Sequence, residues 1–233
     1  MDLDGAVALV TGANRGLGEA FTRGLLARGA KVYGAARDPS TIRVEGVEPL
    51  RLDVTSADDL AAARRRCGDL TLLVNNAGIS TGTRVLSEGA IEAGRRELET
   101  NVFGMLATSQ AFAPVLAANG GGAIVNVLSV LSWLSLPATA MYAASKAAAW
   151  SVTNSLRLEL RPQGTLVVGV HCGFLDTDMA ARVDQPKLAP REVVEQALDA
   201  VVAGRTEVLA DEVSRRVRAG LSGDLVALYP ELG

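Results

Sequence analysis

A tyrosine and a lysine four residues apart, Tyr142 and Lys146, have the spacing best suited to chemistry in this 233-residue sequence. On a helix, residues four apart lie on one face, so the phenol and the ammonium would be neighbours. A free tyrosine titrates near pH ~10, and a cation beside it favours the phenolate and lowers its pKa. The pair therefore predicts a proton donor and acceptor, and Ser129 is near enough in sequence to bind the oxygen that gains or loses the proton.

A glycine-rich segment near the N-terminus predicts a cofactor site for this pair. The apolar run 6–10 leads into Thr11-Gly-Ala-Asn-Arg-Gly-Leu-Gly18, and apolar residues at helical spacing follow over 19–28. Glycines permit unusual turn dihedrals and close backbone approach, while free amides at a helix start receive a pyrophosphate. The spacing is Gly-x-x-x-Gly-x-Gly, so the loop taken alone also fits an ordinary strand–helix turn.

Alternating strand and helix patterns must position these residues. Apolar runs predict strands at 6–11, 31–36, 47–52, 70–75, 122–128, 165–171 and 206–210. Helical spacing predicts helices at 16–28, 57–67, 87–99, 101–118, 142–161 and 190–203, with a loose tail from 211. Nearly continuous apolar strands joined by helices indicate an α/β fold: a doubly wound, seven-stranded parallel sheet with helices on both faces. We find no linker or repeat, so residues 1–233 are expected to form a single domain.

In such sheets ligands bind beyond the carboxyl ends of the strands. The residues that follow such ends here are Gly12, Asp53, Asn75, Ser129 and Gly173. Motif placement and periodicity therefore agree on one edge of the sheet.

Together these motifs resemble the short-chain dehydrogenase/reductase family in its compact single-domain form. Further matching segments are Leu52-Asp-Val54, Leu73-Val-Asn-Asn-Ala-Gly78, Glu99-Thr-Asn-Val102 and Ile124-Val-Asn-Val-Leu-Ser129. They run in the family's order from residue 6 to about residue 180. The resemblance implies a Rossmann-like fold and reversible hydride transfer between nicotinamide C4 and a carbonyl or carbinol carbon.

The resemblance also implies a catalytic tetrad. Tyr142 would exchange the proton, Ser129 would polarise the carbonyl, Lys146 would lower the tyrosine pKa and bind the nicotinamide ribose, and Asn101 would hold a water. Taken singly, Ser129 also fits a strand-end cap and Asn101 a helix cap. The cofactor-binding residues implied by the family motifs are Gly12, Asn14, Arg15, Gly16, Leu17, Gly18, Arg37, Asp53, Val54, Asn75, Ala77, Gly78, Tyr142, Lys146, Gly173 and Thr177.

The end of the second strand favours NADP(H) as the cofactor, and NAD(H) remains possible. Arg37 lies where the chain would meet the adenosine ribose, and a guanidinium offers forked donors to a 2′-phosphate. Arg15 in the glycine loop adds a second positive charge. Both arginines also fit solvent-exposed positions, and Asp38 could bind ribose hydroxyls after a small backbone shift.

One departure from the family concerns Cys172, which stands where a proline is usual and removes its fixed φ. The thiol would lie near the cofactor, but a cysteine is often only a small buried hydrophobe. Gly173 and Thr177 remain in place. The only histidine, His171, closes an apolar strand and fits a packed or capping role better than a catalytic one.

The substrate pocket is predicted to be apolar. Its candidate lining residues are Leu131, Trp133, Leu136, Met141 and Phe174, although some of these also fit the core or a subunit contact. This lining favours a hydrophobic ketone, aldehyde or secondary alcohol. The segment 178–190 is expected to form a short lid that leaves the pocket open to varied substrates.

Composition narrows the class of protein further. The net charge of −3 argues against a nucleic-acid surface, and two cysteines give neither a disulfide framework nor a metal site. We expect a cytoplasmic protein with no membrane-spanning stretch and no signal peptide. Small and apolar faces on 101–118 and 142–161 favour a homodimer or homotetramer, although the tail from 211 could cover them in a monomer.

Two other functions fit the same fold. A nucleotide-sensing binding or regulatory protein is the main alternative, because fold does not determine function. Such a protein would not need the four tetrad residues. An isomerase or dehydratase that uses nicotinamide transiently is the third possibility, but a larger C-terminal substrate domain would be expected.

Overall fold

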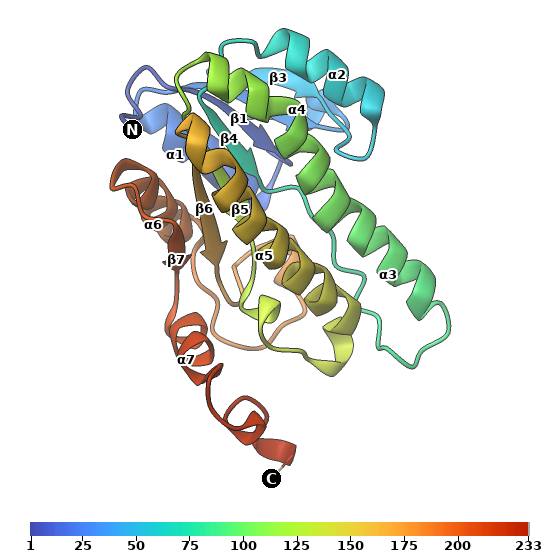
Figure 1. The fold of residues 1–233 in the computed structure, drawn as a ribbon. Helices are drawn as coiled ribbons and strands as arrows, with labels where there is room; N and C mark the ends of the chain where they lie inside the picture. Colours follow the sequence, from blue (N-terminus) through green and yellow to red (C-terminus); the bar gives the residue numbers. More distant parts are fainter. Residues whose placement is uncertain (233) are drawn as a thin grey trace.

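A computed structural model describes residues 1–232, and a seven-stranded parallel sheet forms its centre (Figure 1). The strands are β1 (Val7–Thr11), β2 (Lys31–Ala36), β3 (Glu48–Arg51), β4 (Leu72–Asn75), β5 (Ala123–Val127), β6 (Leu166–His171) and β7 (Glu207–Leu209). Their order in the sheet is β3-β2-β1-β4-β5-β6-β7, and every neighbouring pair is parallel. The predicted fold class is confirmed.

Helices cover both faces of this sheet (Figure 1). The helix pair α1 (Gly16–Ala27) and α6 (Pro190–Val202) packs on one face. On the other face lie α2 (Ala57–Arg66), α4 (Met105–Ala118) and α5 (Ala140–Leu160). The remaining helices are α3 (Ala90–Leu98), which leads into α4, and α7 (Glu212–Gly220), which follows β7.

Alternation along the central strands explains why the strands are apolar throughout. In β4, Leu72 and Val74 face the α1–α6 layer, while Leu73 packs in the cluster on the α2, α4 and α5 side. Successive side chains of a strand point to opposite faces, and here both faces are covered. Two apolar cores therefore hold the sheet between them.

The expected break between helices 87–99 and 101–118 is absent from the structure. A π-helical segment, Glu99–Gly104, joins α3 to α4 without interruption. Gly104 allows this turn to approach the loop after β3, because a Cβ there would lie 2.6 Å from Val54 Cγ2. By length and composition alone, the helical run Ala90–Ala118 is long and apolar enough to cross a membrane. Half of its best window is buried in the protein, as in a core helix.

The C-terminal tail extends beyond α7 at the lower end of the view in Figure 1. Leu228 packs in the cluster around Leu131 and Ala143, and the Ser135 amide donates a hydrogen bond to Tyr229 Oη at 2.8 Å. Leu225 and Leu232 remain exposed. The tail thus docks in part on the loop that precedes α5.

Candidate active site

The candidate catalytic residues converge at the carboxyl end of the sheet. Ser129 follows β5, Tyr142 lies in the first turn of α5, and Lys146 lies one turn later on the same helix. The Ser129 hydroxyl hydrogen-bonds the Tyr142 oxygen. Lys146 Nζ lies 5.7 Å from the centre of the Tyr142 ring and donates to the Val127 carbonyl at 2.8 Å. The helical spacing therefore places the phenol and ammonium together, as predicted.

Burial dominates the electrostatics of this pair. It raises the pKa of Tyr142 above its ordinary value, with a further increase from Cys172 and Glu97, while the Ser129 hydrogen bond lowers it in part. Burial also lowers the pKa of Lys146 to about 8. Desolvation is thus the largest effect on the pKa of Tyr142, and the ammonium of Lys146 hydrogen-bonds the Val127 carbonyl. Tyr142 is therefore held as a neutral phenol, the form that donates a proton.

Asn101 lies within the π-helical segment and is 3% exposed. Its Oδ1 accepts from the Ile79 amide at 2.8 Å, and its Nδ2 donates to the Ile79 carbonyl and to Ser145 Oγ, both at 2.9 Å. The helix-cap alternative for Asn101 is therefore wrong. Ser129 does act as a cap, since its Oγ accepts from the Leu131 amide at 3.1 Å, while it also contacts Tyr142.

The glycine loop has the backbone geometry that a dinucleotide requires. Gly12 and Gly16 have φ values of 65° and 55°, in the left-handed region that favours glycine. Helix α1 begins at Gly16 with no side-chain cap, so its first-turn amides are available to an anion. A Cβ at Gly18 would collide with the Gly12 carbonyl oxygen. The loop therefore fits the pyrophosphate of a nicotinamide dinucleotide.

The structure distinguishes two adjacent asparagines at the end of β4. Asn75 points to the face of the sheet that α4 covers, where its Nδ2 donates to Ser109 Oγ and Asn126 Oδ1 at 3.0 and 2.9 Å. Asn76 instead braces the glycine loop, with its Nδ2 donating to the carbonyls of Thr11 and Gly12 at 2.9 and 3.2 Å. The side chain of Asn75 is thus structural, and Asn76 is a residue of this loop that the sequence reasoning missed.

Other predicted cofactor residues lie along the same edge. Thr177 is next to the glycine loop, since a Cβ at Gly16 would lie 3.2 Å from Thr177 Cγ2. The Ala77 amide donates to Thr11 Oγ1 at 3.0 Å, and a Cβ at Gly78 would lie 3.1 Å from Asn101 Oδ1. Residues of the set that are partly or fully buried near these loops are Asn14, Leu17, Asp53, Val54 and Gly173. The structure therefore brings the glycine loop, the segment after β4 and Thr177 together at one edge of the sheet.

The residues expected at the adenosine ribose differ in their freedom. Arg37 is exposed just after β2. Asp38 accepts hydrogen bonds from the Ser40 amide and hydroxyl at 3.0 and 2.7 Å, and these bonds lower its pKa. Asp38 is thus occupied as the cap of a short helical turn. Arg15 lies 3.6 Å from Asp178, and both side chains are largely exposed.

Cys172 and His171 lie at the end of β6, next to the site. Burial raises the pKa of the Cys172 thiol to about 12, so it is a protonated thiol near neutral pH. His171 is fully buried, its Nδ1 lies 3.1 Å from the Ser129 carbonyl, and its ring stacks on Trp133 at 3.8 Å. Trp133 also meets Trp150 edge-on at 5.8 Å. His171 and Trp133 are therefore packing residues beneath the site.

We expect acid to destabilise the protein through His171. Burial lowers its pKa from 6.5 to about 4, so the unfolded chain binds a proton that the folded protein excludes. This contribution to stability is complete above about pH 6.5 and is lost as the pH falls, by about 2 to 3 kcal/mol at about pH 4.5. Urea unfolding above about pH 6.5 and at about pH 4.5 measures this loss of unfolding free energy. The loss should be smaller for His171→Phe, which keeps a ring against Trp133. An equal loss in the two proteins would contradict this prediction.

Three of the five candidate substrate residues cluster with Tyr142 in the first turn of α5. Leu131 is buried, and Trp133 and Leu136 pack in the same cluster as Tyr142. Met141 packs on α3, where a Cβ at Gly94 would lie 2.5 Å from its Cε. Phe174 precedes the predicted lid, and its carbonyl accepts from the Leu188 amide at 2.9 Å. Together with the pairing of Leu175 and Leu188, this bond closes the base of segment 178–190.

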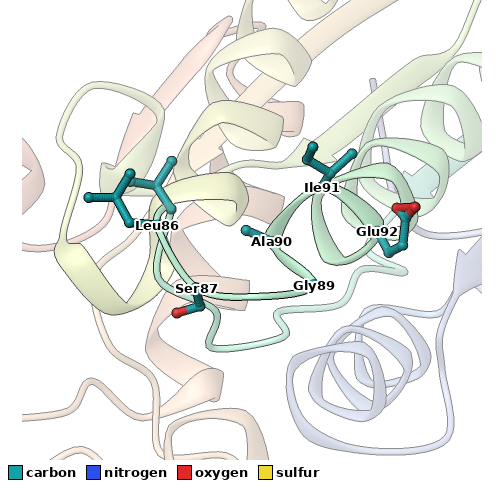
Figure 2. Close-up of a pocket in the computed structure, with 7 residues that line it drawn as sticks. Leu86, Ser87, Gly89, Ala90, Ile91 and Glu92 are labelled. Carbon is teal, nitrogen blue, oxygen red and sulfur yellow. The ribbon is translucent and has the colours of Figure 1, made fainter.

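An apolar depression lies outside this arrangement, at the start of α3 (Figure 2). Its lining includes Leu86, which is 96% exposed, so the depression is a surface feature and not an enclosed pocket. A second depression connects Leu86 with Pro137 and Ala140, just before Tyr142. The second depression thus reaches Ala140, two residues before Tyr142 in the sequence. Within residues 1–232, no cluster of histidine, cysteine or acidic residues could hold a metal ion.

Comparison with known proteins agrees with this geometry. The family model for short chain dehydrogenase matches residues 6–188. The 3-oxoacyl-[acyl-carrier-protein] reductase of Vibrio cholerae is 35% identical over 189 residues, which cover 77% of each protein.

Two solved structures carry nicotinamide cofactors on a similar fold. A short chain dehydrogenase from Burkholderia cenocepacia, in complex with NADP, has a TM-score of 0.94 and 42% identity, and the match covers 100% of this chain and 99% of that one. A short chain dehydrogenase/reductase from Burkholderia phymatum, in complex with NAD, has a TM-score of 0.82 and 27% identity, with 95% of each chain covered. Relatives of this chain therefore bind either nicotinamide dinucleotide.

Proposed function

The chain belongs to the short-chain dehydrogenase family of oxidoreductases, and from this premise we propose that it is an NADP(H)-dependent reductase of hydrophobic ketones or aldehydes, acting also on secondary alcohols in reverse. The observation that carries the proposal is the convergence of Ser129, Tyr142 and Lys146 at the carboxyl edge of the sheet, beside the glycine loop. A binding protein without chemistry has no need of this arrangement.

In the proposed mechanism, Tyr142 donates a proton to the carbonyl oxygen of the substrate. Ser129 hydrogen-bonds the same oxygen and stabilises the negative charge that develops on it. A bound nicotinamide cofactor supplies the hydride in reduction and accepts it in oxidation. After proton transfer, Lys146 stabilises the phenolate of Tyr142.

Proton supply is assigned to Lys146 and Asn101. A lysine whose pKa is near 8 exchanges protons close to neutral pH, so Lys146 can return a proton to Tyr142. Asn101 is expected to hold a water that connects Lys146 to solvent. Its two hydrogen bonds to Ile79 fix the backbone beside this path.

The preference for NADP(H) rests on Arg37 and on the occupation of Asp38 by Ser40. A guanidinium binds a phosphate through forked, charge-assisted hydrogen bonds, whereas ribose hydroxyls call for a free carboxylate. The Burkholderia cenocepacia relative bound to NADP supports the same preference.

We expect Arg37→Ala to weaken NADPH binding by about tenfold and to leave NADH binding nearly unchanged, because only NADPH loses a phosphate contact. Nicotinamide fluorescence titration with both cofactors measures this difference. Arg64→Ala, an exposed arginine on α2, is the matched control and should change neither affinity. An equal loss for NADPH and NADH would contradict the assignment.

The substrate class follows from the apolar residues Leu131, Trp133 and Leu136, which cluster with Tyr142, together with the apolar surface that leads to Pro137. Turnover of NADPH and NADH with aryl and alkyl ketones, aldehydes and diketones tests it. Strict preference for one compact polar substrate would contradict both the apolar pocket and the open lid. A homodimer or homotetramer and a cytoplasmic location stay predictions from the sequence.

A further inference from the structure

Glu97 is an acidic residue buried next to the candidate site, and the mechanism above does not use it. It lies on α3 and is 1% exposed. Among residues 1–232, no lysine or arginine forms an ion pair with Glu97. A glutamate is almost never fully buried unless it is paired, because desolvating a charge is unfavourable. Its burial therefore calls for an explanation.

One oxygen of Glu97 holds the segment 80–83, between β4 and α3, which we expect to form one wall of the substrate pocket. Oε1 accepts hydrogen bonds from the amide and the hydroxyl of Thr81, at 2.6 and 2.9 Å. The Thr81 hydroxyl also hydrogen-bonds that of Thr83 at 2.9 Å. One turn further along the helix, Asn101 binds both backbone groups of Ile79. Two side chains of one helical run thus anchor the segment 79–83.

The other oxygen, Oε2, is buried and has no hydrogen-bond partner. A carboxylate with only one hydrogen-bonded oxygen is a costly way to anchor a segment. A glutamine or threonine could hold Thr81 without a buried charge. The carboxylate therefore adds something that the hydrogen bonds to Thr81 alone do not.

The packing of α3 on α5 places this carboxylate near Tyr142. Gly94, three residues before Glu97, packs against Met141, and Asn101, four residues after it, donates to Ser145. Residues at these spacings share one helix face. Glu97 thus lies opposite the turn of α5 between Met141 and Ser145, which contains Tyr142.

We propose that Glu97 is a positioning residue of the site, which fixes the Thr81–Thr83 wall to α3 and holds a negative charge beside the Tyr142 phenol. This inference rests on the proposed function and deepens it, because a negative charge there opposes formation of the phenolate and keeps the residue ready to donate a proton to a carbonyl.

Polar and charged groups around Tyr142 come from the elements packed on it. Lys146 lies on its own helix, Ser129 and Cys172 come from the ends of β5 and β6, and Asp211 lies behind Cys172. Glu97, on α3, acts on Tyr142 in the same direction as the burial does and raises its pKa. Of the groups that act on Tyr142, Glu97 is the one whose charge can be removed without changing its shape.

The decisive experiment measures ionisation of Tyr142 with and without this charge. Phenolate absorbance is followed against pH in the NADP⁺ complex of the wild type and of Glu97→Gln, with Tyr142→Phe as the blank. The glutamine keeps an oxygen for Thr81, so only the charge changes. We expect the midpoint to fall by about 0.5 to 1 pH unit, or an increase of about 3- to 10-fold in phenolate at any pH well below it.

Two further variants separate charge from position. Glu99→Gln removes an exposed charge two residues away and should leave the midpoint unchanged. Thr81→Val removes the hydroxyl bonds to Glu97 and Thr83 and keeps the amide bond and the charge, so KM should rise while the pH midpoint stays constant. In turnover, the acidic limb of alcohol oxidation should move to lower pH for Glu97→Gln alone.

Identical titrations of Tyr142 in the wild type and Glu97→Gln would overturn the role of the charge, and an unchanged KM in Thr81→Val would overturn the role of the wall. The absorbance titration needs no turnover. An inactive wild type with a shifted titration would therefore refute the proposed function while supporting the assignment of Glu97.

Discussion

Replacing Tyr142 with phenylalanine is expected to reduce carbonyl reduction by about 10² to 10⁴-fold, the usual contribution of a positioned general acid. The ring that packs with Leu131 and Trp133 is kept, so only the proton donor and its contact with Ser129 are lost. Because the phenol oxygen is not needed to hold the glycine loop, NADPH should bind with nearly unchanged affinity. The loss should therefore appear in kcat and not in cofactor binding.

Initial rates of NADPH oxidation with a ketone that the wild type reduces measure this effect. Tyr33→Phe is the matched control: its hydroxyl binds Lys31 and Asp69 at the edge of β2, away from Ser129, and its loss should leave the rate unchanged. If the wild type binds NADPH tightly but turns over no carbonyl compound, the nucleotide-sensing alternative takes first place. A Tyr142→Phe protein as active as the wild type would show that another group supplies the proton.

The strands were the most predictable part of this molecule. Each observed strand begins and ends within two residues of its predicted bounds. The physical reason is that a parallel sheet covered on both faces buries nearly every side chain, so its strands read as continuous apolar runs. Glycine or polar residues at the run ends mark where that burial stops.

Helix boundaries were harder where one helical run changes its hydrogen-bonding pattern. The segment Glu99–Gly104 contains no proline and has neither a charge cluster nor a cap, so nothing in the sequence marks a π-helical turn. Asn101 was identified only by its family motif. The hydrogen bonds that it makes, two to Ile79 and one to Ser145, join three segments far apart in the sequence.

Side-chain direction explains why Asn76, and not the predicted Asn75, contacts the glycine loop. Asn75 is the last residue of β4, and alternation puts it on the same side as Leu73, toward α4. Asn76 then points to the opposite side, where it reaches Gly12. Applying the period of two to the strand end would have found Asn76 from the sequence. The same reasoning at helical spacing, counted back from Asn101, would have found Glu97.

The sequence reports which charges lie near Tyr142 and not how deeply the tyrosine is buried, so it does not predict the desolvation that raises the pKa in this structure. Lys146 is close to Tyr142, yet both are desolvated and Lys146 donates to the Val127 carbonyl. Desolvation depends on packing from α3, β5 and β6 together. A neutral phenol beside a lysine of lowered pKa suits proton donation, the role that reduction requires.

The second large effect is expected at Gly18. Its φ is ordinary, so backbone freedom is not the reason for glycine here; a Cβ would collide with the Gly12 carbonyl oxygen and lie 2.5 Å from Asn76 Nδ2. Because Gly12 O is backbone and Asn76 holds the loop, neither can yield without moving the glycine turn. We expect Gly18→Ala to lower the free energy of unfolding by about 2 to 4 kcal/mol, and to weaken NADPH binding by about 100-fold or more.

Thermal unfolding and NADPH titration of the purified variant measure the two effects, and the melting temperature should fall by about 4 to 16 °C. Gly68→Ala is the matched control, since a Cβ there meets no atom within 4 Å and should change neither quantity. A Gly18→Ala protein with normal stability and poor NADPH binding would show that the loop can shift without loss of folding stability. The substitution would then act only on the binding of the pyrophosphate. Normal values for both would show that the close packing of Gly12, Gly18 and Asn76 is not what shapes the cofactor loop.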